Sequence, residues 1–218
     1  MPTRELLSPA QRAQFLSLPA EMSEQMLARY YTLSSEDLVR IRHHRRSHNK
    51  LGFAVQLAYL RFPGRTWMAS EEASPLVVSH VASQLKVNPM GIVQYASERE
   101  ATRFEHLAEL QKAYGFRQLT SRDYRELSAW LMPLALSTDA GPALVGALIE
   151  EMRDRQIIIP GITTVERLGW EVRRRAQRQV FRLLTEGLTD LQRTRGRPMT
   201  CFRASNSRIF CSKSIPGR

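Results

Sequence analysis

Apolar side chains recur at helical spacing along most of the chain, and residues that favour helix N-termini precede many of these stretches. Ser8 followed by Pro9 predicts the start of one helix, and Ser23 predicts the start of a second. The spacing of Ser34 and Asp37 resembles a capping box, in which side chain and backbone of the two residues bond reciprocally. The pattern therefore predicts three successive short helices at the beginning of the chain.

The most apolar stretch lies between residues 51 and 60. Its apolar positions fall at helical spacing, Asn49 is suited to cap its N-terminus, and Pro63 with Gly64 ends it. The sequence thus predicts a buried helix with a strongly basic segment, "RHHRRSHNK" at residues 42–50, at its beginning.

Helical signals continue downstream. Ser74 and Pro75 start another helix, a further one closes at Gly115, and "TSRDYRELSAWLMPLAL" at residues 120–136 repeats the cap and the apolar stripe. Only "QIIIPGI" at residues 156–162 resembles a strand, and we interpret it as an apolar connector because one isolated run cannot form a sheet. We therefore predict an all-α, multi-helical fold of two packed helical modules.

The segment "STDAGP" at residues 137–142 is the best candidate for a boundary, because small and helix-breaking residues cluster there. We expect an N-terminal helical DNA-binding module at residues 1–137 and a second helical module at 138–190. The second module has a helix, a short connection and a basic helix, with Thr163 and Glu166 as a capping box, which is a helix-turn-helix outline. Residues 191–218 are basic, lack acids and an apolar period, and are predicted to be disordered.

Charge narrows the choice of partners. The chain has 218 residues, and 32 Lys and Arg against 21 Asp and Glu give a formal charge of +11. Such a balance favours a polyanionic partner, and double-stranded DNA is the leading candidate, although basic proteins with other roles share it. No apolar run is long enough to span a bilayer and no signal peptide is evident, so we expect a cytoplasmic protein, nucleoid-associated when bound to DNA, without membrane contact.

The densest positive charge surrounds the start of the buried helix. There are more cations here than are needed to complement the dipole at a helix C-terminus. Two explanations therefore compete for them, namely contact with DNA phosphates and a solvated helix end. We predict that this region binds DNA through Arg40, Arg42, Arg45, Arg46, His48, Asn49, Lys50 and Arg61.

A metal site among His43, His44 and His48 is disfavoured, because the neighbouring cations would repel a divalent ion and no carboxylate or thiolate completes a ligand set. His48 is better explained as a polar anchor at the helix junction. The two cysteines, Cys201 and Cys211, have no zinc spacing around them. No metal, no other cofactor and no catalytic motif is predicted.

The helix expected over residues 164–186 has two faces. Val165, Leu168, Val172, Ala176 and Val180 form its apolar side. A basic side lies opposite the apolar side. It either contacts double-stranded DNA or is an ordinary solvated helix surface. We predict that it binds DNA through Arg167, Arg173, Arg174, Arg178 and Arg182.

Four stretches of the chain resemble the N-terminal region of Tn3 family transposases. These are "LLSPAQRAQF", "HNKLGFAVQL" followed by "RFPG", "REATRFEHLAELQKAYGFR" and "IIIPGITTVERL". The resemblance extends over about residues 4–188 and implies helical modules that recognise the terminal inverted repeats of a transposon. It also implies that the Asp-Asp-Glu catalytic core of the family is missing, so no enzymatic activity is expected. Because residues 189–218 depart from the family pattern, we hypothesise that a frameshift or insertion replaced the coding sequence there.

Two alternatives remain open beside DNA binding. The chain is either a helical interaction module, which pairs with full-length transposase or with itself through apolar helix faces, or a transposase remnant without a function.

Overall fold

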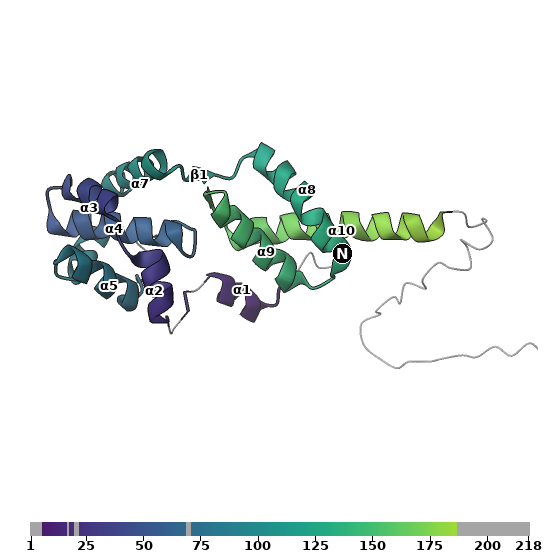
Figure 1. Ribbon diagram of the computed structural model, residues 1–218, viewed down its shortest axis with the longest axis horizontal. Helices are drawn as coiled ribbons and strands as arrows, with labels where there is room; N and C mark the ends of the chain where they lie inside the picture. The colour runs from purple at the N-terminus through teal and green to yellow at the C-terminus, as the bar shows by residue number, and fades with distance from the viewer. Residues whose placement is uncertain (1–5, 17, 20–21, 69–70, 187–218) are drawn as a thin grey trace, which may run out of the picture. The chain divides into compact units, whose positions relative to one another are not determined.

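The computed structural model describes residues 6–16, 18–19, 22–68 and 71–186. The chain divides into two units, residues 1–180 and 181–218. Figure 1 shows the elements in chain order, which are α1 (Pro9–Leu16), α2 (Glu24–Tyr31), α3 (Ser35–Arg42), α4 (Ser47–Arg61), α5 (Pro75–Leu85), α6 (Gly91–Ala96), α7 (Glu100–Tyr114), β1 (Arg117–Gln118), α8 (Ser121–Ser137), α9 (Gly141–Asp154), β2 (Ile157–Ile158) and α10 (Ile162–Thr185). The predicted all-α class is confirmed. Within the described ranges, no helix is long and apolar enough to cross a membrane.

Several predicted helix starts are confirmed by their caps. The Ser23 hydroxyl accepts a hydrogen bond from the Met26 amide at the start of α2. Ser34 with Asp37, before α3, and Thr120 with Asp123, before α8, form complete capping boxes. These polar side chains satisfy amides that the first helical turn leaves without partners, so the local sequence alone sets where these helices begin.

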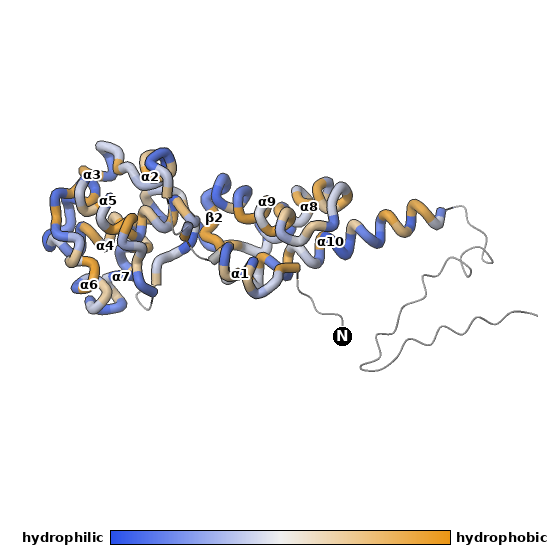
Figure 2. The backbone as a smooth tube through the Cα atoms, turned by 90° about the horizontal axis from the view of Figure 1, so that it is seen from below, coloured by the Kyte–Doolittle hydropathy of each residue, from blue (hydrophilic) through white to orange (hydrophobic). Residues whose placement is uncertain are grey.

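The first hydrophobic core surrounds α4. Eleven of its residues are buried, His48 and those from 51 to 60, so the helix is covered on all sides. Helices α2, α3, α5, α6 and α7 each contribute a buried side chain to this core, namely Tyr31, Ile41, Val77, Tyr95 and Leu110. Figure 2 shows the hydrophobic character of α4 amid these helices.

Gly52 permits the close approach of α6 to α4. A Cβ atom built at Gly52 would overlap the ring of Tyr95, which is fully buried. Only a residue without a side chain therefore leaves room for this ring beside the α4 backbone.

A second core lies between α8, α9 and α10. Its buried residues include Leu127 and Leu131 of α8, Leu144 and Leu148 of α9, and Leu168 of α10, and the N-terminal residues Leu6 and Leu7 pack with them. Residues on both sides of the expected boundary after position 137 thus build one core. The division into modules at 1–137 and 138–190 stays a prediction, and the tail at 191–218 lies outside the described residues.

The interpretation of "QIIIPGI" as a connector alone is wrong. Ile157 and Ile158 form a two-residue strand that pairs in parallel with Arg117 and Gln118. Because successive strand side chains point to opposite faces, Ile157 enters the second core and Ile158 the first. The segment therefore ties the two cores together, and the connection between α9 and α10 is longer than the three- or four-residue turn of a DNA-binding helix-turn-helix.

The predicted capping box of Thr163 and Glu166 is also wrong. Helix α10 already begins at Ile162, and Glu166 is buried within it. The Glu166 carboxylate accepts hydrogen bonds from the Leu7 amide at 3.2 Å and from the Arg12 guanidinium at 2.7 Å. The carboxylate thus holds the beginning of the chain against α10 instead of capping the helix, a pairing between residues 154 positions apart that local sequence does not reveal.

Candidate nucleic-acid interface

The turn between α3 and α4 gathers five cations, which we call the basic tip: Arg40, Arg42, Arg45, Arg46 and Lys50. Arg40 and Arg42 lie in the last turn of α3, and Arg46 stands at the N-cap of α4. Arg42, Arg45 and Arg46 are exposed, while Arg40 and Lys50 are partly buried. The basic tip therefore presents three guanidinium groups to solvent on one short turn.

Two cations of the basic tip, Arg46 and Lys50, lie at the N-terminus of α4, where positive charge opposes the helix dipole. The prediction that Asn49 caps this helix is wrong, because Asn49 lies inside it and the N-cap residue is Arg46, which makes no capping bond. The first turn of α4 contains no acidic residue. A positive charge at a helix N-terminus is unfavourable by about 0.3 to 1 kcal/mol, so Arg46 and Lys50 do not stabilise α4 through its dipole.

Glu98 neutralises one side of the basic tip. Its carboxylate lies 3.2 Å from Arg46 and 2.9 Å from Nε2 of His48, which is buried. The hydrogen bond from His48 holds the pKa of Glu98 below its ordinary value. His48 thus joins α4 to the segment before α7, as expected of a polar anchor. Arg42 and Arg45 form no ion pair within the part of the chain that the structure describes.

Arg61 lies in a different environment from the other predicted cations. It donates two hydrogen bonds to the buried Asp37, at 3.0 and 2.9 Å, and Tyr114 donates a third at 2.6 Å. Burial opposes ionisation of Asp37, but the hydrogen bonds from Tyr114, the Ser34 amide and Arg61 outweigh it, and its pKa lies below the ordinary value. Burial raises the pKa of Tyr114 to about 12, with a further contribution from Asp37. The guanidinium of Arg61 is thus used within the fold.

The basic tip rests on buried rings. The His44 ring packs against Phe53 and against His106, each at a centroid distance of 4.4 Å. Burial lowers the pKa of His44, and burial together with His44 lowers that of His106 to about 4. Both rings are therefore neutral at pH 7, and the contact of His44 with Phe53 packs the turn of the basic tip on the first core. No group of three or more His, Cys, Asp or Glu side chains in the described residues is arranged to hold a metal ion.

Helix α10 supplies a second basic surface. Val165, Leu168, Val172 and Ala176 are buried as predicted, but Val180 is 39% exposed, because the second core ends one turn earlier. Figure 2 shows how hydrophobic and hydrophilic residues alternate along this helix.

The arginines of α10 differ in their surroundings. Arg167, Arg174, Arg178 and Arg182 are exposed, whereas Arg173 is partly buried and lies 3.5 Å from Asp139. The guanidinium of Arg174 stands 5.2 Å above the ring of Trp170, which orients it. Sequence reasoning missed Arg175, which is also exposed, although its place in the run "RRR" beside two predicted residues was a usable signal.

Comparison with known proteins links this arrangement to transposases. Residues 6–172 match the model of a family described as a domain of unknown function, DUF4158. The chain is 43% identical over 195 residues to the transposase for transposon Tn21 of Escherichia coli, a match that covers 89% of this chain and 19% of the relative. It is 37% identical over 190 residues to the transposase for transposon Tn1546 of Enterococcus faecium, with 87% and 19% covered.

These matches confirm the resemblance to Tn3 family transposases. The chain spans about a fifth of the length of the curated relatives it matches. The relatives share their identity with this chain over the region that contains the basic tip, both cores and most of α10. Because the family model covers most of its length, the chain belongs to the DUF4158 family.

Proposed function

We propose that this chain binds double-stranded DNA at the terminal inverted repeats of a transposon. The observation that carries the proposal is the basic tip, where Arg42, Arg45 and Arg46 are exposed on one short turn between two helices. Arg46 and Lys50 oppose the dipole of α4, and Arg42 and Arg45 form no ion pair within the described residues, so contacts within the fold do not account for the cluster as a whole. Contact with a phosphate backbone explains it, and the similarity to transposases agrees with DNA as the partner.

The two basic surfaces have different tasks in this proposal. The basic tip contacts phosphates and fixes the position of the protein without reading sequence. The exposed Arg174 and Arg178 of α10 contact base edges, because guanidinium groups on a helix are suited to the acceptor atoms of guanine in the major groove. Arg61 is left out of the proposed interface because it pairs with Asp37.

Binding at several salt concentrations tests the role of the basic tip. We expect Arg42→Ala with Arg45→Ala to weaken binding to all duplexes alike and to lower the slope of log affinity against log salt by about 0.9 for each lost phosphate contact. Arg122→Ala with Arg125→Ala removes the same charge from exposed positions of α8 and serves as the matched control. Equal effects of the two pairs would show that only net charge matters and would refute the proposal for the tip.

Sequence discrimination tests the role of α10. We expect Arg174→Ala with Arg178→Ala to reduce the preference for terminal-repeat DNA over scrambled DNA by about 1 to 3 kcal/mol for each lost base contact. The tip variant should keep that preference. If instead the α10 variant keeps its full preference, base readout by this helix is excluded.

We further propose that the chain acts in binding and not in catalysis. Strand transfer needs clustered carboxylates that hold metal ions, and the described residues offer no such cluster. We expect no nicking of terminal-repeat DNA with Mg²⁺ or Mn²⁺. Nicking by pure protein that a carboxylate substitution abolishes would contradict this.

One observation favours a second role as an interaction module. In the described part of the unit at 181–218, Phe181, Leu183 and Leu184 are 57%, 61% and 72% exposed. Apolar side chains gathered in the last turns of a helix are suited to contact another protein chain, and the candidates are full-length transposase and a second copy. Light scattering of the chain alone and with transposase tests this role, and a monomer in both samples would exclude it.

A further inference from the structure

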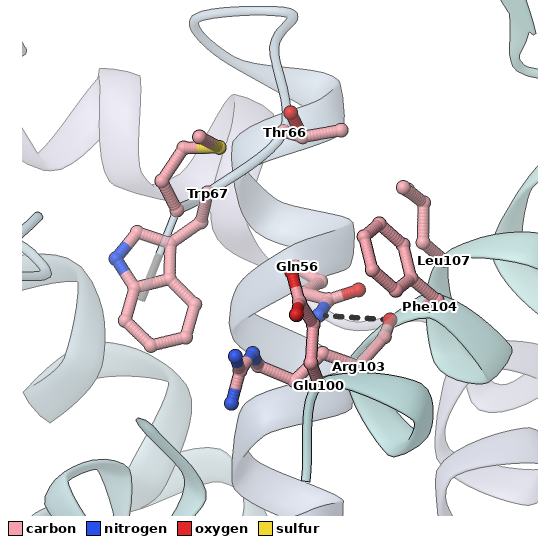
Figure 3. Close-up of a pocket in the computed structure, with 8 residues that line it drawn as sticks. Gln56, Thr66, Trp67, Glu100, Arg103, Phe104 and Leu107 are labelled. Carbon is pink, nitrogen blue, oxygen red and sulfur yellow. Dashed lines mark hydrogen bonds between the residues drawn. The ribbon is translucent and has the colours of Figure 1, made fainter. Parts of the chain in front are cut away.

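A cavity of about 280 Å³ lies between α4, the segment after it and α7. Figure 3 shows the side chains around it, which come from residues far apart in the sequence. The residues used below are Gln56 of α4, Thr66 and Trp67 of the following segment, and Arg103 and Phe104 of α7. None of them belongs to the two basic surfaces described above.

Gln56 brings a hydrogen-bond acceptor without a partner to this cavity. The residue is 5% exposed. Its Nε2 donates to the Tyr95 hydroxyl at 2.8 Å and to the Arg103 carbonyl at 3.4 Å, and the dashed line in Figure 3 marks the latter bond. Its Oε1 is buried and accepts no hydrogen bond from any described residue.

The surrounding bonds fix which end of the Gln56 amide is the acceptor. A carbonyl oxygen such as that of Arg103 accepts only, so the amide nitrogen must face it. The Tyr95 hydroxyl receives the second hydrogen of this nitrogen and bonds to Nδ1 of His106 at 2.9 Å. The unsatisfied atom is therefore Oε1, and buried acceptors of this kind are rare in proteins unless a ligand or water supplies the donor.

Aromatic side chains line the same cavity. Trp67 is 6% exposed, and its Nε1 donates to the Glu71 carbonyl at 3.2 Å, which fixes the indole. Phe104 is 61% exposed, so its ring presents surface on which an entering group can pack. A flat ligand with an N–H edge fits these two features, because its faces contact the rings and its edge donates to Oε1 of Gln56.

The cavity is also connected to the basic tip. Arg103 donates to the Ala96 and Glu98 carbonyls, and the Glu98 side chain binds Arg46 and His48.

We propose that this cavity takes up one unpaired nucleobase of the bound DNA. A nucleobase has two aromatic faces, N–H donors on its edge and flanking phosphates for the basic tip, and proteins hold extruded bases by stacking together with edge contacts. The proposal rests on the proposed function, since it assumes that the tip lies on DNA. Because Oε1 does not touch solvent, the base must displace the exposed Phe104 ring, which then stacks on it.

Three duplexes of one sequence test the proposal by fluorescence anisotropy: fully paired, with a single-nucleotide bulge, and with an abasic residue in the bulge. We expect wild-type protein to bind the bulged duplex about tenfold more tightly than the paired one, since stacking on an aromatic side chain is worth about that factor or more. The abasic bulge is equally flexible but has no base, and should bind like the paired duplex. Equal affinity for the two bulges would overturn the proposal.

Protein variants locate the contact. Phe104→Ala, at an exposed position, should abolish the preference for the bulge and leave the affinity for paired DNA unchanged. Met90→Ala, at a position that is 69% exposed and outside the cavity, should keep both. A preference that survives Phe104→Ala would refute the assignment to this cavity. Failure to bind paired DNA would instead refute the proposed function, so the two failures are distinguishable.

Discussion

Acidification from pH 7 to pH 5 should destabilise the fold through His106. The ring is buried, and its pKa is lowered from 6.5 to about 4 by burial and by the neighbouring His44. The unfolded chain therefore binds a proton near pH 6.5 that the folded chain refuses until about pH 4. Since the unfolded state binds more protons in this interval, the free energy of unfolding must fall as the pH falls.

The expected size follows from the two pKa values. Each tenfold difference in proton affinity is worth about 1.4 kcal/mol, so the shift of His106 lowers the free energy of unfolding by about 2 kcal/mol between pH 7 and pH 5. The pKa of His44 is lowered too and adds to this loss. The pKa values of Asp37 and Glu98 lie below their ordinary values, so both remain ionised in this interval.

Urea unfolding followed by circular dichroism at pH 7, 6 and 5 measures this loss. The variant His106→Gln keeps an acceptor for the Tyr95 hydroxyl but does not titrate, and should lose about 2 kcal/mol less than wild type over the same interval. If the unfolding free energy of His106→Gln depends on pH as strongly as that of wild type, the loss does not come from His106 and the prediction is refuted.

Two further substitutions test the packing around α4. Gly52→Ala should cost about 1 to 3 kcal/mol in urea unfolding, because its methyl group would overlap the buried Tyr95 ring, whereas Gly161→Ala, whose added Cβ atom would have its nearest neighbour at 4.0 Å, should be close to neutral. Asp37→Asn removes the charge that Arg61 and Tyr114 share and should cost about 2 to 3 kcal/mol at pH 7. The cost should shrink as the pH falls below the ordinary pKa of an aspartate, because the unfolded chain then binds a proton that the folded Asp37, with its lowered pKa, still refuses. A neutral Asp37→Asn at pH 7 would show that this buried network does not stabilise the fold.

Local sequence determined much of the secondary structure. Helix starts at Ser23, Ser34 and Thr120 follow from side chains that bond to amides three residues away, so no distant residue is needed to place them. The residues from 51 to 60, apolar apart from Gln56, likewise indicated a helix buried on all sides. The resemblance to transposases was also evident from short motifs, and the family match confirms it.

The tertiary structure decided which polar residues are available to a partner. In the sequence, Arg46 and Arg61 are both basic residues at the ends of one predicted helix. In the structure, Arg61 forms an ion pair with the buried Asp37, whereas Arg46 is exposed. Glu166 matches a capping box by its spacing, but it bonds to Arg12. Gln56 and Phe104 meet at one cavity although they lie on different helices. Such pairings depend on contacts between residues far apart in the chain, and the periodicity of a sequence carries information only about neighbours within a few turns.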